Sequence, residues 1–180
     1  DAARAIGAVN TIRRDPDGRL IGDMFDGTGF VAGLKKCGND PAGRKVLLLG
    51  AGGAAAAIAH ALAKAGVDAL TIANRTHSKA QEMVERVAGS VPGVRVAAGD
   101  DDPSGYDMVV NATSLGMRPD DPLPLDVARL SPDTLVAEII MKPEMTALLQ
   151  QAQARGCPIH LGRHMLEEQA ALMVGFMTAG

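Results

Sequence analysis

Five consecutive residues, Gly50–Ala51–Gly52–Gly53–Ala54, are of types suited to binding a phosphate group. Together with Ala55 they give the spacing G-x-G-x-x-A, in which the first glycine permits a tight turn and the second lets the backbone approach a pyrophosphate. An apolar run over 46–49 precedes them and an alanine-rich segment over 54–64 follows, which predicts a buried strand and then a helix. This strand–turn–helix context favours a dinucleotide-binding loop over a glycine-rich turn without a ligand.

The residues after the next predicted strand, 69–73, indicate which dinucleotide would bind. A site for NAD usually has Asp or Glu there to accept a hydrogen bond from the ribose 2′-hydroxyl, whereas this sequence has Asn74, Arg75 and Thr76, with Lys79 close behind. A guanidinium and an ammonium group can hold a 2′-phosphate. A solvated helix start would explain the same cations, but cations at a helix N-terminus are unfavourable without an anion. The pattern predicts NADP as the cofactor.

The elements that would position these residues alternate between strand and helix. Strands are expected at 46–49, 69–73, 94–96, 108–110 and 135–137, and helices at 54–64, 78–87, 144–154 and 165–177. Before them, residues 8–12 and 20–21 read as a hairpin with its turn at 15–18, and a helix is expected over 27–36. The pattern predicts an α/β protein with a doubly wound, mostly parallel, Rossmann-like sheet and a short N-terminal hairpin.

Composition excludes several classes of function. The net charge of −3 and an aromatic content of 2% provide neither the positive charge nor the stacking surface for nucleic-acid binding. The apolar runs are too short to span a membrane. Cys37 and Cys157 lie far apart without metal-ligand spacing, which predicts reduced thiols and a cytoplasmic location. No metal is expected, since the histidines show no ligand spacing: His60, His77, His160 and His164.

Further segments have no purely structural explanation, and together they resemble the shikimate dehydrogenase family in order and spacing. They are Ala8–Val9–Asn10–Thr11, Asp26–Gly27 with Gly29, the 50–54 loop, Asn74–Arg75–Thr76, Asn111–Ala112–Thr113–Ser114 with Gly116, Pro143 with Thr146, and Gly162 with Met165–Leu166 and Gln169–Ala170. The resemblance implies a two-domain reductase that transfers a hydride between NADP and the C–O carbon of a small-molecule substrate, a ring acid of the shikimate type. It leaves the oligomeric state open, a homodimer included.

The resemblance also implies roles for individual residues. Asn10 and Asp26 would bind ring hydroxyls, with Asp26 one half of a catalytic Lys–Asp pair, and Gln169 would contact the substrate. The remaining matches would lie at the cofactor: Ile139 and Gly162 near the nicotinamide, and Thr113 and Ser114 near the inner ribose and phosphate. Each substrate residue has a plain alternative, because Asp26 could cap the helix that begins near Gly27, Asn10 could be a turn amide, and Gln169 could be solvated.

The sequence departs from the family pattern in three respects. The segment with the catalytic lysine is expected to be missing. Residues 1–40 would then be the end of the substrate domain with a connecting helix, and residues 41–160 would be the NADP-binding domain. Residues 161–180 would form a helix that returns toward the substrate domain. Met24–Phe25 replaces two polar residues before Asp26, which would add an apolar wall to the substrate site. Met141 replaces a substrate-binding tyrosine, and Glu138 an aspartate.

These departures keep more than one function open. We expect the 180 residues to bind NADP but to turn over little or no substrate, and the substrate could be quinate or an aminated analogue rather than shikimate. A catalytically silent NADP-binding regulatory module is the main alternative. Retention of Asn10, Asp26 and Gln169 opposes it, since a cofactor sensor needs no substrate residues. Another Rossmann enzyme, such as a relative of methylene-tetrahydrofolate dehydrogenase, agrees less well with the segments 111–114 and 162–169.

Overall fold

A six-stranded parallel sheet forms the centre of the computed structural model, which describes residues 2–178. Its strand order is β5-β4-β3-β6-β7-β8, so the chain starts in the middle at β3, winds outward through β4 and β5, and then returns to the other side. The strands are β3 (Lys45–Leu49), β4 (Ala69–Ala73), β5 (Val96–Gly99), β6 (Met108–Asn111), β7 (Leu135–Glu138) and β8 (Ile159–His160). This order puts a topological switch point between β3 and β6, where α/β proteins bind ligands.

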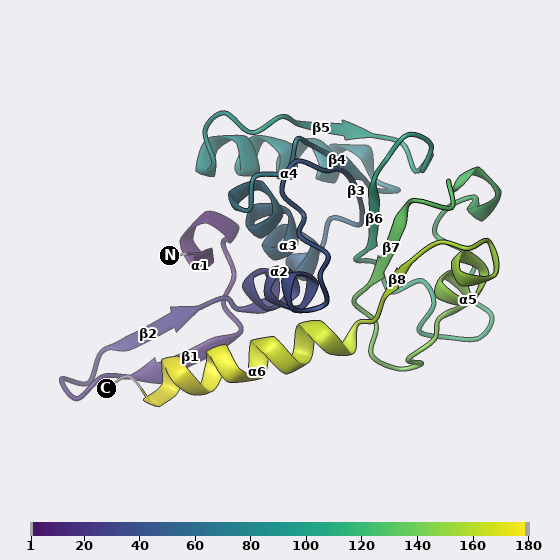
Figure 1. Cartoon of the computed structure of the whole chain (residues 1–180). Coiled ribbons are helices and arrows are strands. Elements are labelled where there is room, and N and C mark those ends of the chain that lie inside the picture. The colour runs from purple at the N-terminus through teal and green to yellow at the C-terminus, as the bar shows by residue number, and fades with distance from the viewer. Residues whose placement is uncertain (1, 179–180) are drawn as a thin grey trace.

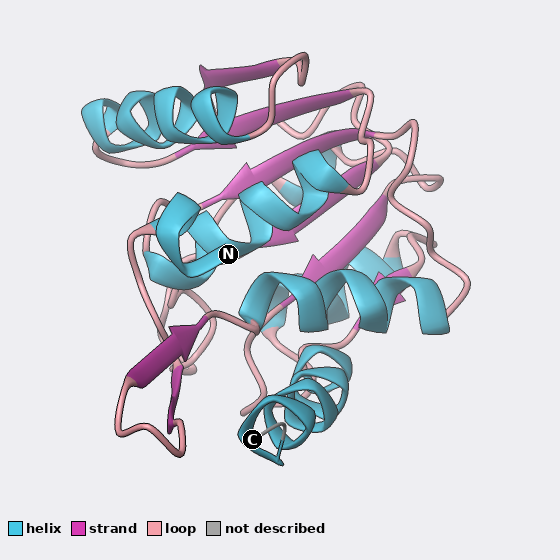
Figure 2. Ribbon diagram, turned by 90° about the vertical axis from the view of Figure 1, so that its left-hand side faces the viewer, coloured by secondary structure: helices cyan, strands magenta, loops and turns pink. Residues whose placement is uncertain are grey.

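Helices cover both faces of the sheet because its central strands are apolar on both sides. Val46 and Leu48 of β3 point into one core, whereas Leu47 and Leu49 point into the other. The first core is closed by α2 (Asp26–Lys36), α3 (Gly53–Lys64) and α4 (His77–Ser90). The second is closed by the short 3-10 helix η1 (Val127–Arg129) and by α5 (Ala147–Ala154). The layers are visible in Figure 2.

A small antiparallel hairpin stands apart from the main sheet. It consists of β1 (Thr11–Arg14) and β2 (Leu20–Asp23), preceded by the short helix α1 (Ala2–Ile6). The last helix, α6 (Arg163–Thr178), packs along α2 and extends to β1, so the C-terminal end of the described chain lies beside the hairpin (Figure 1). None of the helices over 2–178 is both long and apolar enough to cross a membrane.

The predicted fold class is confirmed, and the differences concern short elements and boundaries. The sequence did not predict α1, η1 or the two-residue strand β8. Strand β5 covers 96–99 instead of 94–96, and helix α5 begins at Ala147 instead of 144. The later start of α5 has a local cause: the Thr146 hydroxyl accepts a hydrogen bond from the backbone N–H of Leu149, which caps the helix there.

Candidate functional site

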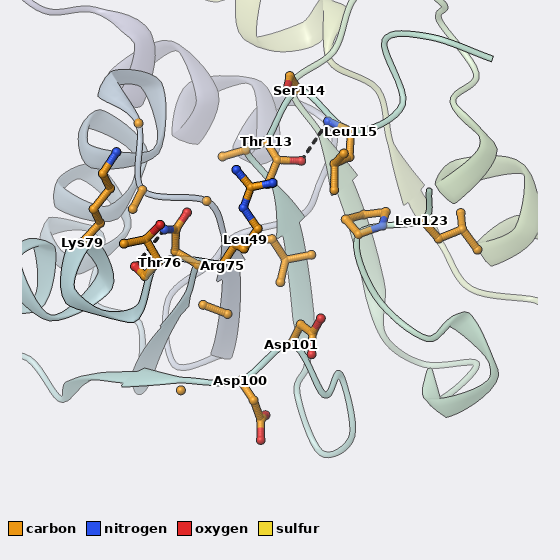
Figure 3. Close-up of a pocket in the computed structure, with 18 residues that line it drawn as sticks. Leu49, Arg75, Thr76, Lys79, Asp100, Asp101, Thr113, Ser114, Leu115 and Leu123 are labelled. Atoms are coloured by element: carbon orange, nitrogen blue, oxygen red, sulfur yellow. Dashed lines mark hydrogen bonds between the residues drawn. The ribbon is translucent and has the colours of Figure 1, made fainter. Parts of the chain in front are cut away.

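A cavity of about 740 Å³ opens at the carboxyl ends of β3, β4 and β6, beside the switch point of the sheet (Figure 3). Its volume lies in the range of small-molecule and cofactor sites. Most of the predicted cofactor residues line it: Gly50, Ala51, Gly52, Asn74, Arg75, Thr76, Lys79, Thr113 and Ser114. Gly53, Ala54, Ile139 and Gly162 are outside this lining. The structure thus brings together residues from three separate stretches of chain.

The glycine loop between β3 and α3 has the conformation that its sequence requires. Gly50 has φ of +112°, and a Cβ there would lie 2.7 Å from the carbonyl oxygen of Ala112, so both the backbone angle and the space exclude a side chain. Around Gly52 and Gly53 the space is open. Gly52 precedes α3 without a side-chain cap, so the first N–H groups of this helix remain available to an anion. The loop therefore fits a dinucleotide pyrophosphate.

The end of β4 presents cations and a second uncapped helix start. The side chain of Asn74 donates a hydrogen bond to the carbonyl of Thr76 at 2.9 Å, which shapes the turn before α4. Thr76 precedes α4 but makes no side-chain cap bond. Arg75 and Lys79 are exposed, and within residues 2–178 neither forms an ion pair. This leaves two free cations beside a helix N-terminus, an arrangement suited to a phosphate.

Two carboxylates that the sequence analysis did not assign to the pocket also line the cavity. Asp100 and Asp101 follow β5, which pairs with β4 and therefore ends at the same edge. In the view of Figure 3 the guanidinium of Arg75 points away from both carboxylates and toward Thr113. The cavity lining thus contains both cations and carboxylates.

A buried polar network holds the loop after β6. Asn111 is 0% exposed and its amide donates to the carbonyl of Leu115 and to Glu138 Oε2, each at 3.0 Å. Its Oδ1 accepts hydrogen bonds from the backbone N–H and the hydroxyl of Thr113, at 3.1 and 2.7 Å. Asn111 thereby fixes the course of the chain through Thr113 and Ser114, which form one wall of the cavity.

Glu138, at the end of β7, is the other centre of this network. It is also 0% exposed, and besides Asn111 it accepts hydrogen bonds from the backbone N–H groups of Ile139 and Ile140 and from the Thr146 hydroxyl. Burial raises the pKa of the carboxyl group, and these hydrogen bonds act in the opposite direction. Glu138 thus positions the loops after β6 and β7.

A second cluster of polar side chains lies at the start of α2. Asp26 Oδ1 accepts a hydrogen bond from the Asn10 amide and another from the Gln169 amide, both at 2.6 Å. Asn10 Oδ1 in turn accepts from the N–H of Phe25 at 3.2 Å. All three side chains of the cluster are half-buried. We call Asn10, Asp26 and Gln169 the Asp26 cluster.

The geometry of this cluster decides against the plain alternatives for Asp26 and Gln169. Asp26 is the first residue of α2, not its cap, and no side-chain cap bond is formed there. Gln169 is bonded to a residue 143 positions away rather than solvated. The adjacent Gly27 packs its Cα against the carbonyl of Ala57, one turn into α3. The Asp26 cluster therefore lies close to the helix that begins at the glycine loop.

Glycines allow the helices of this region to approach each other closely. A Cβ at Gly29 would lie 2.8 Å from the Cβ of Gln169, and one at Gly33 would lie 2.9 Å from the carbonyl oxygen of His164. Gly162 packs equally tightly against the backbone of Ile139 and Ile140. These contacts hold α6 against α2 and against the loop after β7. They also place Ile139 beside Gly162, and the family resemblance implies that both residues lie near the nicotinamide.

Residues that depart from the family pattern have different surroundings. The Met24 side chain is only 6% exposed and belongs to the core, so the expected apolar wall in the substrate site does not include it. Phe25 packs on Phe176 of α6, with ring centroids 5.3 Å apart. Met141 is 46% exposed and is free to contact a ligand. The apolar side chain of Met24 is therefore explained by its packing in the hydrophobic core.

The structure corrects the prediction that the histidines and cysteines share no ligand geometry. Cys37, His160 and His164 come together where α2 ends and α6 begins, although 123 or more residues separate Cys37 from the other two. Burial, with the nearby His164 as a second cause, lowers the pKa of His160 to about 4. His60 instead pairs with Ser90 at 3.0 Å, and His77 is exposed.

Fold and site together define a class of protein: a Rossmann-type α/β protein with a cavity beside its glycine loop, at the switch point of its sheet. The family model "Shikimate / quinate 5-dehydrogenase" matches residues 33–116. A shikimate dehydrogenase (NADP(+)) of Rubrobacter xylanophilus is 43% identical over 175 residues, which cover 92% of this chain and 60% of that protein.

Solved structures agree with this match. A quinate dehydrogenase from Corynebacterium glutamicum in complex with NAD has a TM-score of 0.91 at 32% identity, covering 99% of this chain and 65% of that one. A 5-ketofructose reductase of Gluconobacter has a TM-score of 0.90 at 38% identity, covering 100% and 66%. The chain belongs to the shikimate/quinate dehydrogenase family. It spans less than two thirds of the length of these relatives.

Proposed function

We propose that this chain is the NADP-binding portion of an oxidoreductase that transfers a hydride between NADPH and the carbonyl carbon of 3-dehydroshikimate or a related ring acid. The observation that carries the proposal is the Asp26 cluster: residues 10, 26 and 169 converge through two hydrogen bonds of 2.6 Å next to the helix of the glycine loop. A protein that only bound a dinucleotide would have no use for this cluster. The family relation supports the same activity.

The cofactor would be held mainly by backbone groups and by two cations. The N–H groups at the start of α3 would bind the pyrophosphate, and Gly52 would allow close approach because no atom occupies the space beside it. Arg75 and Lys79 would bind the 2′-phosphate that distinguishes NADP from NAD. Thr113 and Ser114 would contact the inner ribose side from the loop that Asn111 fixes.

The chain's own contribution to the reaction would be to orient the substrate and to manage one proton. Bound NADPH supplies the hydride, and reduction of a ketone converts its oxygen into an alkoxide that must receive one proton. Asp26 Oδ1 is held by two amide donors, whereas Oδ2 has no partner within residues 2–178. This leaves Oδ2 free to accept a hydrogen bond from a ring hydroxyl or to orient a proton donor. Asn10 and Gln169 would fix the carboxylate in that orientation.

The proposed substrate class rests on the residues that surround Asp26 and on the range of reactions in the family. Met141 offers an exposed apolar contact where a tyrosine would donate a hydrogen bond, which favours a substrate with one hydroxyl fewer or differently placed. Quinate dehydrogenase and 5-ketofructose reductase show that relatives of this fold act on different polyhydroxy compounds. The 180 residues by themselves are expected to turn over little or no substrate.

Calorimetric titration with NADP and with NAD tests the proposal directly. Wild-type chain should bind NADP in the micromolar range and NAD more weakly. Arg75→Asp should weaken NADP binding by roughly 30-fold, since a hydrogen bond to a charged group contributes about 2 kcal/mol, and it should improve NAD relative to NADP. Arg19→Asp, at the hairpin turn outside the cavity lining, is the matched control. Equal effects of both variants would remove Arg75 from the site, and absence of binding in the wild type would refute the cofactor assignment.

A further inference from the structure

Three side chains that can bind a metal converge at the end of the α2–α6 pair opposite to the Asp26 cluster. Cys37 follows the last residue of α2, His160 ends β8, and His164 lies in the first turn of α6. Cys37 Sγ lies 3.5 Å from His164 Nδ1, and this Nδ1 lies 3.4 Å from His160 Nδ1. One ligand atom from each residue lies within 4.8 Å of the others.

These two separations agree with the edges of a zinc coordination tetrahedron. Zinc binds thiolate sulfur at about 2.3 Å and imidazole nitrogen at about 2.0–2.1 Å, so tetrahedral angles place sulfur and nitrogen about 3.5 Å apart and two nitrogens about 3.4 Å apart. Two of the three contacts in the cluster thus already have the lengths that one shared zinc ion requires. One position of the tetrahedron would remain for a water molecule or another ligand.

Hydrogen bonding within the protein does not satisfy this cluster. His164 Nδ1 faces both the thiol and His160 Nδ1, although a ring nitrogen has only one proton or one lone pair to offer. His160 is 1% exposed, and the ring nitrogen that faces the cluster, Nδ1, has His164 as its one hydrogen-bond partner among residues 2–178. Buried polar groups are nearly always partnered, and a metal ion would accept the lone pairs of all three side chains at one point.

We propose that Cys37, His160 and His164 form a binding site for one Zn²⁺ ion. A thiolate with two imidazoles binds zinc in preference to magnesium or calcium, which favour oxygen ligands. Cys37 is exposed, which gives the ion a path from solvent, whereas the buried His160 anchors it to the sheet. Bound zinc would clamp the end of α2 to β8 and α6. Because α2 and α6 carry Asp26 and Gln169, the ion would stabilise the helix pair that holds the Asp26 cluster.

Cobalt and zinc titrations of the chain, prepared without a histidine tag and freed of metal with a chelator, test this site. Co²⁺ should give the absorption band of a thiolate–cobalt bond together with the intense visible bands of tetrahedral cobalt. Zn²⁺ should displace the Co²⁺ ion, so that these bands disappear. Cys37→Ser should abolish the thiolate band and weaken zinc binding by at least about 100-fold, since even losses outside the ligand shell cost 10–100-fold. His164→Ala should weaken zinc binding as strongly.

Two control variants separate this site from nonspecific binding. Cys157→Ala removes the other cysteine and His77→Ala removes an exposed histidine, and both should retain the cobalt spectrum and the zinc affinity of the wild type. Zinc should also raise the melting temperature of the wild type but not of Cys37→Ser, whose folding is checked by circular dichroism. A wild-type chain without the thiolate band, or a Cys37→Ser variant with unchanged zinc affinity, would overturn the proposal.

Discussion

The cavity at the glycine loop, from here on called the pocket, and the Asp26 cluster are built in opposite ways. The pocket is formed by short stretches of chain at the ends of neighbouring parallel strands, and within each stretch its residues follow one another closely in the sequence, as in the loop from Gly50 to Gly52. The cluster is formed by side chains that lie 16 and 143 residues from Asp26. The pocket thus depends on local conformation, whereas the cluster depends on how α2 and α6 pack.

This difference predicts that substitutions can damage one region and spare the other. Close packing of α2 on α3 and α6 should control the cluster and the stability of the chain. Open space around the glycine loop should make the pocket sensitive to substitutions that leave the fold intact. The two regions are linked through the packing of α2 on α3, where Gly27 meets the carbonyl of Ala57.

The largest effect is expected for Gly27→Ala, which adds a Cβ where the backbone of Ala57 already lies. Overpacking of this kind costs about 3 kcal/mol, because α2 must move away from α3. Urea unfolding followed by circular dichroism measures the change. Gly89→Ala, in α4 with open space around it, is the matched control and should be neutral or stabilising by up to about 1 kcal/mol. Equal stabilities for the two variants would contradict the packing argument.

Asn111→Ala should come next and would show how far the pocket itself depends on distant contacts. It removes two donors and an acceptor from a buried network and leaves Thr113 without its partner. Unsatisfied buried groups of this kind cost about 2 kcal/mol of the free energy of unfolding. NADP binding should weaken as well, because the loop after β6 loses its anchor. Unchanged stability in urea would mean that Glu138 and Thr113 find other partners.

Gly52→Ala should weaken NADP binding without unfolding the chain. No atom lies within 4 Å of a Cβ at this position, so the fold accepts it, but the methyl group would stand where the pyrophosphate approaches. We expect a loss of roughly tenfold, or about 1.5 kcal/mol, from impaired hydrogen bonds to a charged group. Calorimetry measures the affinity and thermal unfolding provides the control. Wild-type affinity in this variant would place the pyrophosphate elsewhere.

Gln169→Leu should have the smallest effect and should be confined to the Asp26 cluster. It removes one of the two amide donors to Asp26 Oδ1 at a half-buried position, for which we expect a loss of about 1 kcal/mol in stability. NADP affinity should stay as in the wild type, since Gln169 does not line the cavity. A clear loss of NADP affinity would show that the two regions are coupled more strongly than their contacts indicate.

The same contrast explains which features could be predicted from the sequence. Val46–Leu49 and the glycines after it predicted a buried strand and a binding loop, because both signals are local. Two-residue β8 and five-residue α1 were missed, since such short segments have no detectable periodicity. Asp100 and Asp101 were not assigned to the pocket because their position depends on which strand pairs with β4.

Local sequence patterns were enough to predict the alternation of strands and helices, the glycine loop and the cations after β4, because hydrophobic period, glycine content and charge act over a few neighbouring residues. Tertiary structure alone decided that Asp26 is bonded to Asn10 and Gln169 rather than capping its helix, and that Cys37 meets His160 and His164. The difference arises because sequence patterns reflect interactions between neighbouring residues, whereas these contacts join residues that are far apart in the chain. Helix packing through glycine contacts brings together side chains more than 100 residues apart, and the spacing of those residues along the chain contains no trace of that approach.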